Sequence, residues 1–159
     1  MSSDEHELPC LLAPMTNGHL LLPSVAIAEV VRSQRVRTND GLPPWCAGRI
    51  MWRGVIIPLL IYERTNDDEA PDIRPGDGVL VMNRTREVTG LSFYGLVSRG
   101  TPRLLRLADE DLEIVADTPL RSAEQARVQV GEEEAVVPRL AYLEDLIMQH
   151  RLAGPMVRV

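Results

Sequence analysis

One apolar stretch, from Trp45 to Tyr62, limits what this chain can fold into. It is interrupted once, by the pair Arg53-Gly54, and then continues into Pro58. Two apolar runs separated by a glycine-containing pair are typical of a β-hairpin, because glycine adopts the positive φ that a tight turn needs. We therefore expect Arg53 at an exposed hairpin tip. Pro58 has no N–H to donate, so its strand is expected at a sheet edge or beside a bulge.

The rest of the chain is ordinary in size and composition. It has 159 residues, of which 45% are hydrophobic and 25% charged, which is typical of one globular domain with one or two small cores. The net charge of −6 argues against nucleic acid as a partner, because binding phosphate usually needs an excess of basic residues. All basic residues apart from the histidines are arginines, whose planar fork suits ionic contacts with carboxylates.

The sequence also carries signals about location. No apolar run approaches the length of about 18 residues that a membrane-spanning helix needs. The N-terminus is acidic and lacks the basic region of a signal peptide. The two cysteines, Cys10 and Cys46, are too few for a disulfide framework. These features predict a cytoplasmic protein without direct membrane insertion.

Short strands punctuated by turns dominate the predicted secondary structure. Turn signals recur every 8 to 12 residues or so, as in small β-barrels. Residues 25–31 fit either a short helix or a bent strand, and 83–87 fit a polar turn. We expect a loose tail at 1–7, one domain over 8–150 with a boundary between its halves near 64–78, and a second tail at 151–159. Nine or ten strands are predicted by this spacing, including 8–13, 19–22, 79–82, 88–97, 104–107, 112–115, 127–130 and 135–137.

One segment near the C-terminus has helical periodicity. Apolar residues recur there at spacings of three and four, which predicts an amphipathic helix over about 139–149; they are Leu140, Leu143, Leu146 and Ile147. Glu144 and Asp145 are expected on the solvent-exposed face of this helix.

Candidate catalytic groups are few. None of the histidines has the spacing of a metal site with a second histidine or a cysteine, and no cofactor or nucleophile motif is present. Cys46 is expected to be a small buried hydrophobe. The acidic run at 109–113 has the composition of a solvated loop. We therefore predict no catalytic, cofactor-binding or metal-binding residues, and a module that binds other proteins.

The pattern resembles the CheW-like adaptor domain family. The resemblance begins with Gly48, Arg53-Gly54 and Pro58 in the central stretch. It continues in the apolar segments 79–82 and 88–97, and in the strand at 135–137 that leads into the helix at 140–147. The resemblance implies a mainly β fold of two intertwined five-stranded barrels with a C-terminal helix. It also implies a non-catalytic adaptor that links chemoreceptors to a CheA-type histidine kinase in signalling arrays.

The resemblance also implies site residues and partners. The partners are the cytoplasmic tip of a methyl-accepting chemoreceptor, the regulatory domain of the kinase, and other CheW-like proteins. A groove between the barrels that receives the receptor tip is expected to include Val30, Leu96 and Val97. Contacts with the kinase and other adaptors are expected at Ile27, Glu29, Gly48, Arg53, Gly54 and Val55.

The sequence departs from the family pattern at several positions and leaves other functions open. Met51-Trp52 precedes Arg53, where the family usually has Asn-Leu, and Tyr94 stands where an Asp is usual. These changes fit either a main coupling adaptor or an accessory member, such as those of pilus-type systems that control twitching motility. The alternatives from other classes are a small-barrel enzyme with a groove active site and a self-associating structural protein.

Overall fold

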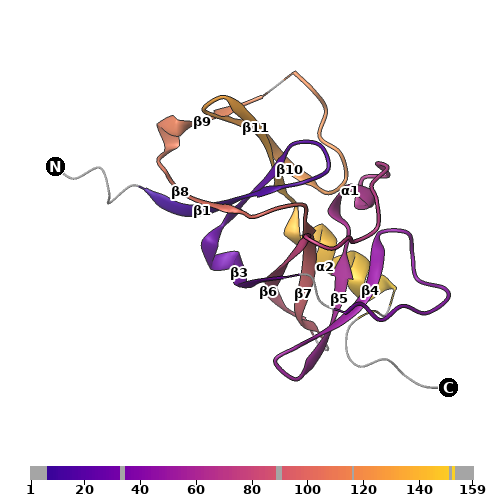
Figure 1. The fold of residues 1–159 in the computed structure, drawn as a ribbon. Coiled ribbons are helices and arrows are strands. Elements are labelled where there is room, and N and C mark those ends of the chain that lie inside the picture. Colours follow the sequence, from indigo (N-terminus) through magenta and orange to yellow (C-terminus); the bar gives the residue numbers. More distant parts are fainter. Residues whose placement is uncertain (1–6, 33–34, 89–90, 116, 151, 153–159) are drawn as a thin grey trace.

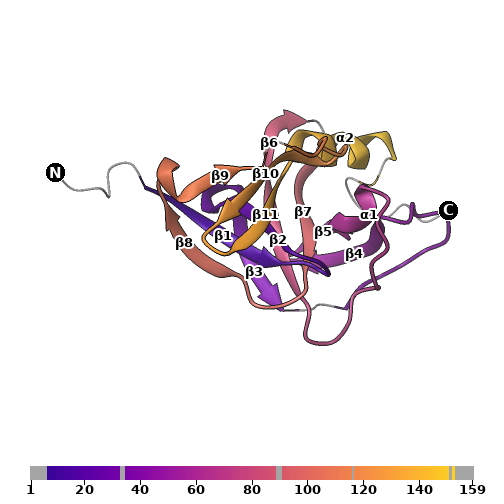
Figure 2. The same cartoon turned by 90° about the horizontal axis from the view of Figure 1, so that it is seen from above.

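The computed structural model describes residues 7–32, 35–88, 91–115, 117–150 and 152. Its strands form two antiparallel-dominated sheets, drawn in Figures 1 and 2. One sheet has six strands in the order β8-β1-β2-β11-β10-β9. Their bounds are β1 Leu8–Pro14, β2 His19–Pro23, β8 Arg103–Leu107, β9 Leu112–Ile114, β10 Glu124–Val130 and β11 Glu133–Pro138.

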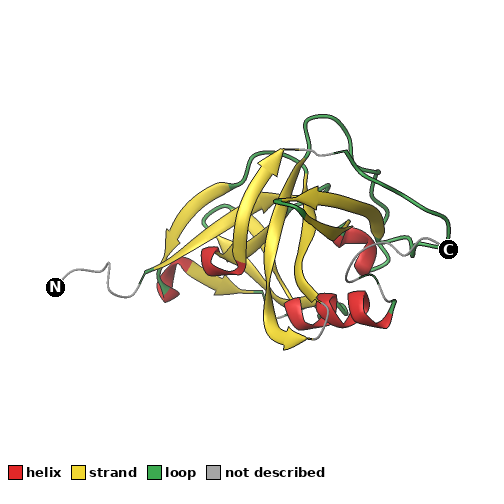
Figure 3. Cartoon of the chain, turned by 90° about the horizontal axis from the view of Figure 1, so that it is seen from below, coloured by secondary structure: helices red, strands yellow, loops and turns green. Residues whose placement is uncertain are grey.

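The second sheet has five strands in the order β3-β6-β7-β5-β4. Their bounds are β3 Ile27–Arg32, β4 Cys46–Trp52, β5 Val55–Leu60, β6 Gly78–Val88 and β7 Leu91–Ser98. The helical elements are η2 (Ser24–Ala26), α1 (Tyr62–Thr65), η3 (Asp109–Asp111) and α2 (Leu140–Gln149). Figure 3 shows the main helix, α2, lying along the outside of the strands. The mainly β prediction with one C-terminal helix is confirmed, although one sheet has six strands rather than five.

The chain enters the second sheet once and leaves it once. The crossings are η2, between β2 and β3, and residues 99–102, between β7 and β8. The prediction of a boundary near 64–78 is therefore wrong, because this segment connects β5 and β6 of the same sheet. Residues 25–31, for which helix and strand both remained open, contain the end of η2 and most of β3.

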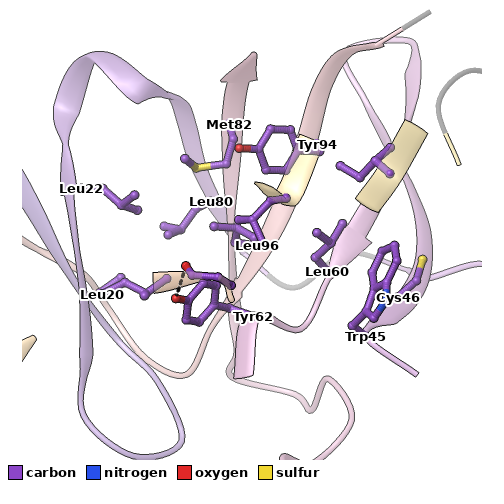
Figure 4. Close-up of a cluster of buried hydrophobic side chains, with 14 of the residues drawn as sticks. Leu20, Leu22, Trp45, Cys46, Leu60, Tyr62, Leu80, Met82, Tyr94 and Leu96 are labelled. Atoms are coloured by element: carbon purple, nitrogen blue, oxygen red, sulfur yellow. Dashed lines mark hydrogen bonds between the residues drawn. The ribbon is translucent and has the colours of Figure 1, made fainter. Parts of the chain in front are cut away.

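Three apolar cores hold the molecule together, because burying aliphatic surface is the main favourable contribution to folding. Each sheet curls around a core of its own, with Leu12 and Val128 in the first and Ile57 and Val79 in the second. The third core is shared by both sheets and α2, and Figure 4 shows its side chains converging. It includes Leu20, Leu22, Trp45, Leu60, Tyr62, Leu80, Met82, Tyr94, Leu96, Leu143 and Ile147.

The central strands β5 and β7 are buried on both faces. They pair in parallel through Leu59 and Gly95, and their neighbouring residues alternate between the second core and the shared core. Strands buried in this way have continuous apolar sequences rather than alternating ones. Of the two alternatives predicted for Pro58, the sheet edge is wrong, because β5 lies between β4 and β7. The bulge is present, because the register of β4 with β5 shifts between Cys46 and Gly48, next to the pair of Arg49 with Pro58. The ladder to β7 begins one residue later, at Leu59, while Pro58 pairs with Arg49 of β4.

Strand β6 runs through the segment predicted as a polar turn. It pairs with β7 as far as Asn83, and pairing resumes at Val88 after a register shift. A carboxylate from α2 satisfies the backbone in between: Thr85 donates to Glu144 Oε2 from its N–H at 2.8 Å and from its hydroxyl at 2.7 Å. Glu144 is consequently fully buried, so its predicted place on the exposed face is wrong, while Asp145 is exposed as predicted.

The predicted tails fall largely outside the described residues. Of 1–7 only Glu7 is described, and of 151–159 only Leu152. Leu152 is 3% exposed and belongs to the shared core. The shared core therefore includes a residue three positions beyond the end of α2.

The five-stranded sheet closes into a barrel at Gly48. Beyond β3, Arg37 forms a bridge with Arg49 of β4, with each backbone N–H donating to the other's carbonyl at 2.8 Å. This approach requires a glycine, because a Cβ on Gly48 would lie 2.3 Å from the Arg37 carbonyl oxygen. Gly48 also has a φ of +138°, a conformation that residues with a side chain rarely adopt.

We expect Gly48→Ala to destabilise the protein by about 2–4 kcal/mol, because it combines backbone strain with a clash against a backbone that cannot move away. Gly131→Ala is the matched control: Gly131 also has positive φ, +60°, but a Cβ added there would have no atom within 4 Å. That control is expected to lose only about 1–2 kcal/mol. Urea denaturation of both variants measures the difference, and equal losses would contradict the role of Gly48 in closure.

Candidate functional site

The β4–β5 hairpin ends in the two-residue turn that the sequence predicts. Arg53 has a φ of +47° and Gly54 a φ of +78°, and Trp52 pairs directly with Val55. Positive φ at both central residues is the type I′ geometry, which matches the twist of the flanking strands. The turn therefore projects the Arg53 side chain, which is 70% exposed, away from the barrel.

A carboxylate from the opposite edge of the sheet anchors this tip. Glu29 lies on β3, and its Oε1 accepts a hydrogen bond from Trp52 Nε1 at 2.8 Å and another from Arg53 Nε at 3.2 Å. Because β3 and β4 are the two edge strands, this pair of bonds joins the edges on the far side of the barrel from the sheet's centre. Glu29 thus links the hairpin tip, at the end of β4, to β3, the strand at the opposite end of the sheet order.

The electrostatics of the tip follow from these contacts. The hydrogen bond from Trp52, and then that from Arg53, hold the pKa of Glu29 below its usual range. The Arg53 guanidinium also lies 5.3 Å from the centre of the Trp52 ring, which in turn packs edge-on against Phe93. Cation–π contact and the ion pair act together to position an exposed guanidinium.

Apolar side chains flank the tip and remain exposed. Met51 is 47% exposed and Val55 is 41% exposed, on the two strands next to the turn. We refer to Glu29, Met51, Trp52, Arg53 and Val55 as the hairpin-tip surface. An arginine and an exposed methionine are both enriched in protein interfaces, so this combination suits a protein partner.

A second surface lies where the chain passes between the barrels. We call it the inter-barrel groove, an open cavity of about 1010 Å³ lined by the end of β3, the loop before β6 and the crossover before β8. Val30, which is 43% exposed, contributes to its β3 wall. The residues that line it are Val30, Val31, Arg32, Arg35, Val36, Ile73, Arg74, Pro75, Gly76, Asp77, Gly78, Gly100, Thr101 and Pro102.

Leu104 lies two residues beyond this crossover, on β8. It is 70% exposed and pairs with Leu11, which pairs in turn with Leu22. Residues paired across strands share a face of the sheet. Leu22 belongs to the core between the two barrels. Leu104 therefore lies on the face of the first barrel that is turned toward the second.

The structure places the predicted site residues in three different settings. Glu29, Arg53, Gly54 and Val55 come together at the hairpin tip, and Val30 lines the groove. Ile27 is half-buried against the shared core. The remaining three are packing residues, because they are buried in the folded protein; they are Gly48, Leu96 and Val97.

The expectation that Leu96 and Val97 form groove walls is therefore corrected. Both are 0% exposed, Leu96 in the shared core and Val97 in the core of the second barrel. One face of β7 packs in the shared core and the other in the core of the second barrel, so neither face reaches solvent at these residues. They support the fold behind the groove and have no surface to offer a partner.

The sequence analysis missed two functional candidates, Leu104 and Trp52. The exposure of Leu104 had a signal in the sequence: Leu104 and Leu105 are adjacent in one strand, so they face opposite sides, and only one of them can fill the barrel. Leu105 packs in the first core and Leu104 is left outside. The role of Trp52 as a donor to Glu29 had no signal of this kind, because the two residues are 23 positions apart.

Other kinds of site find little support in the described part of the chain. Within it, no group of three or more His, Cys, Asp or Glu side chains is placed to hold a metal ion. Burial raises the pKa of the Cys46 thiol, which lowers the thiolate fraction that nucleophilic chemistry needs. Among the described helices, none is long and apolar enough to cross a membrane.

Comparison with known proteins assigns the family. The model of the CheW-like domain matches residues 9–138, which is most of the chain. The protein therefore belongs to the CheW-like domain family. The fold is similar to that of the scaffolding protein TtCheW from Thermoanaerobacter tengcongensis, with a TM-score of 0.70 and 12% identity over 84% of this chain and 90% of that one. No curated protein matches the chain.

Replacing Trp52 by Phe tests the anchor at the hairpin tip. Phe keeps the packing against Phe93 but removes the N–H that donates to Glu29, so the pKa of Glu29 is expected to rise toward its usual value. The wild-type anchor is complete above the usual glutamate range and is lost as the pH falls through the lowered pKa of the folded protein. NMR titration of the glutamate carboxyls measures both; an unchanged Glu29 pKa in the variant would rule out this hydrogen bond.

Proposed function

We propose that this protein is a non-catalytic adaptor that links the cytoplasmic tip of a chemoreceptor to the regulatory domain of a CheA-type histidine kinase. In this proposal the hairpin-tip surface binds the kinase, and the inter-barrel groove with Leu104 binds the receptor. Other CheW-like proteins are further candidate partners of the same two surfaces. The protein would act in the cytoplasm, in association with membrane-bound receptor arrays.

The observation that carries the proposal is the anchored arginine at the hairpin tip. Exposed arginines are usually mobile, and ordering one on binding costs side-chain entropy. Here Glu29 and the Trp52 ring hold Arg53 in place while its side chain stays 70% exposed. A guanidinium positioned in advance, with apolar side chains beside it, has the character of an interface hot spot.

The groove lining favours an adaptor over an enzyme. Among its described lining residues the single carboxylate, Asp77, is 5% exposed and lies 2.8 Å from Arg99 Nη1, so it is neutralised by a buried partner. No histidine, cysteine or serine belongs to the same set of described lining residues. A groove active site would need a general acid or base free to react, and among the described lining residues Asp77 is the one carboxylate and is already paired with Arg99.

Whether the protein is a core adaptor or an accessory member of a pilus-type system depends on the kinase. A core adaptor binds both the receptor and the kinase, and an accessory member binds the receptor alone. The departures of Met51 and Trp52 from the family pattern lie on the hairpin-tip surface itself, so they bear on this choice. Control of twitching motility is the output we associate with the accessory alternative.

Two charge substitutions separate the partners in a pull-down with purified receptor tips and kinase regulatory domains. We expect Arg53→Glu to abolish kinase binding while receptor binding persists. The substitution places a carboxylate beside Glu29 and opposite the hydrogen-bond acceptors of the kinase, so both contacts become repulsive. Leu104→Asp is expected to do the reverse. Both side chains are 70% exposed, so the fold should survive, as circular dichroism will verify.

Matched controls exist for each substitution. Arg139→Glu changes an exposed arginine ahead of α2, and Ile114→Asp changes a side chain on β9 that is 72% exposed. Neither lies on the two surfaces, and both variants are expected to bind like the wild type. If the wild type binds neither partner, the adaptor proposal fails; concentration-dependent self-association in sedimentation would then favour a structural protein.

A further inference from the structure

Three arginines converge on the inter-barrel groove from separate parts of the chain. Arg32 ends β3, Arg35 lies just beyond it, and Arg74 belongs to the loop before β6. All three are exposed, and within the described residues none of their side chains has a hydrogen-bond or ion-pair partner. Several other arginines of the chain are paired with carboxylates, for example Arg103 with Glu133 and Arg121 with Asp68.

The local charge is opposite to that of the whole protein. The chain carries a net charge of −6, yet the described lining of the groove has three exposed guanidinium groups and one carboxylate. That carboxylate, Asp77, is buried and already bound by Arg99. The groove therefore has an uncompensated positive charge, which an anionic partner would neutralise.

The loop that carries Arg74 is held in place. Arg99, whose side chain is 4% exposed, donates to Asp77 Oδ2 at 2.8 Å, to the Pro71 carbonyl at 2.5 Å and to the Asp72 carbonyl at 3.1 Å. The Arg74 backbone N–H donates to the same Asp77 oxygen at 2.8 Å. Because this loop is already ordered, it loses less conformational entropy when a partner binds.

The shape and the walls indicate the kind of partner. Aliphatic side chains form much of the lining, including Val30, Val36 and Ile73. Small-molecule sites enclose about 70–90% of their ligand, whereas this cavity is partly open to solvent. A segment of another protein, with carboxylates next to aliphatic side chains, satisfies both the arginine forks and the apolar walls.

We propose that Arg32, Arg35 and Arg74 make the inter-barrel groove selective for an acidic protein segment. The inference rests on the proposed function, in which the receptor tip occupies this groove. It adds that carboxylates on the receptor tip pair with these arginines, while the apolar wall contacts aliphatic side chains next to them.

The test measures the affinity of a chemoreceptor cytoplasmic tip, purified from the same organism, by isothermal titration calorimetry at 50 and 300 mM salt. The triple variant Arg32→Gln, Arg35→Gln, Arg74→Gln removes the charges and keeps polar side chains of similar reach. Exposed ion pairs contribute about two- to fivefold each, so we expect the three changes together to weaken binding about tenfold or more at low salt. The variant's affinity should also respond less to salt than that of the wild type.

Arg139→Gln serves as the control, because Arg139 is exposed and lies outside the groove. Binding of the kinase regulatory domain should be unchanged in the triple variant, which verifies that the hairpin-tip surface is intact. If the triple variant binds the receptor tip like the wild type at both salt concentrations, the inference is wrong and the adaptor function stands. An equal loss for receptor and kinase also overturns it. A wild type that binds no receptor tip overturns the inference together with the proposed function.

Discussion

Closure of the five-stranded sheet is the constraint on which the rest of the structure depends. Its two edge strands, β3 and β4, are far apart in strand order, yet the bridge between Arg37 and Arg49 and the hydrogen bonds of Glu29 join them. Gly48 makes this possible, because no other residue allows the Arg37 backbone to lie so close. Without closure, both edges would expose unpaired backbone groups, and the hairpin tip would lose its anchor.

The same closure connects the fold to both candidate surfaces. Strand β3 contributes Glu29 to the hairpin-tip surface and, one residue later, Val30 to the inter-barrel groove. Successive residues of a strand face opposite sides, so one short strand can serve two partners at once. The shared core fixes the two barrels and α2 against one another. In the proposed function, this arrangement needs no moving part to hold a receptor and a kinase together.

Local features of the sequence predicted the parts of the site that depend on local geometry. The Arg53-Gly54 turn is specified by its own residues, and the helix over 140–149 by its spacing. The burial of β7 could not be predicted from local features. Leu96 and Val97 lie in an apolar run, and such a run fits a groove wall as well as a strand that is buried on both faces. The cores that pack on the two faces of β7 decide between the two, and they are built from residues distant in sequence.

Charged residues were predicted least well. Glu144 has the helical position of an exposed residue, and its bonds to Thr85 of β6 help to explain its burial. The three arginines of the groove are separated by up to 42 positions, and only the folded chain brings them to one cavity. Such long-range charge arrangements have no signal in any local segment of the sequence.

The central claim is that the two surfaces are independent and can be occupied together. Sedimentation velocity on the wild-type protein, mixed with a receptor cytoplasmic tip and a kinase regulatory domain, tests it most directly. The account predicts one faster-sedimenting species that contains all three components, formed whichever partner is added first. Displacement of one partner by the other, with only two-component complexes at every ratio, would contradict the account.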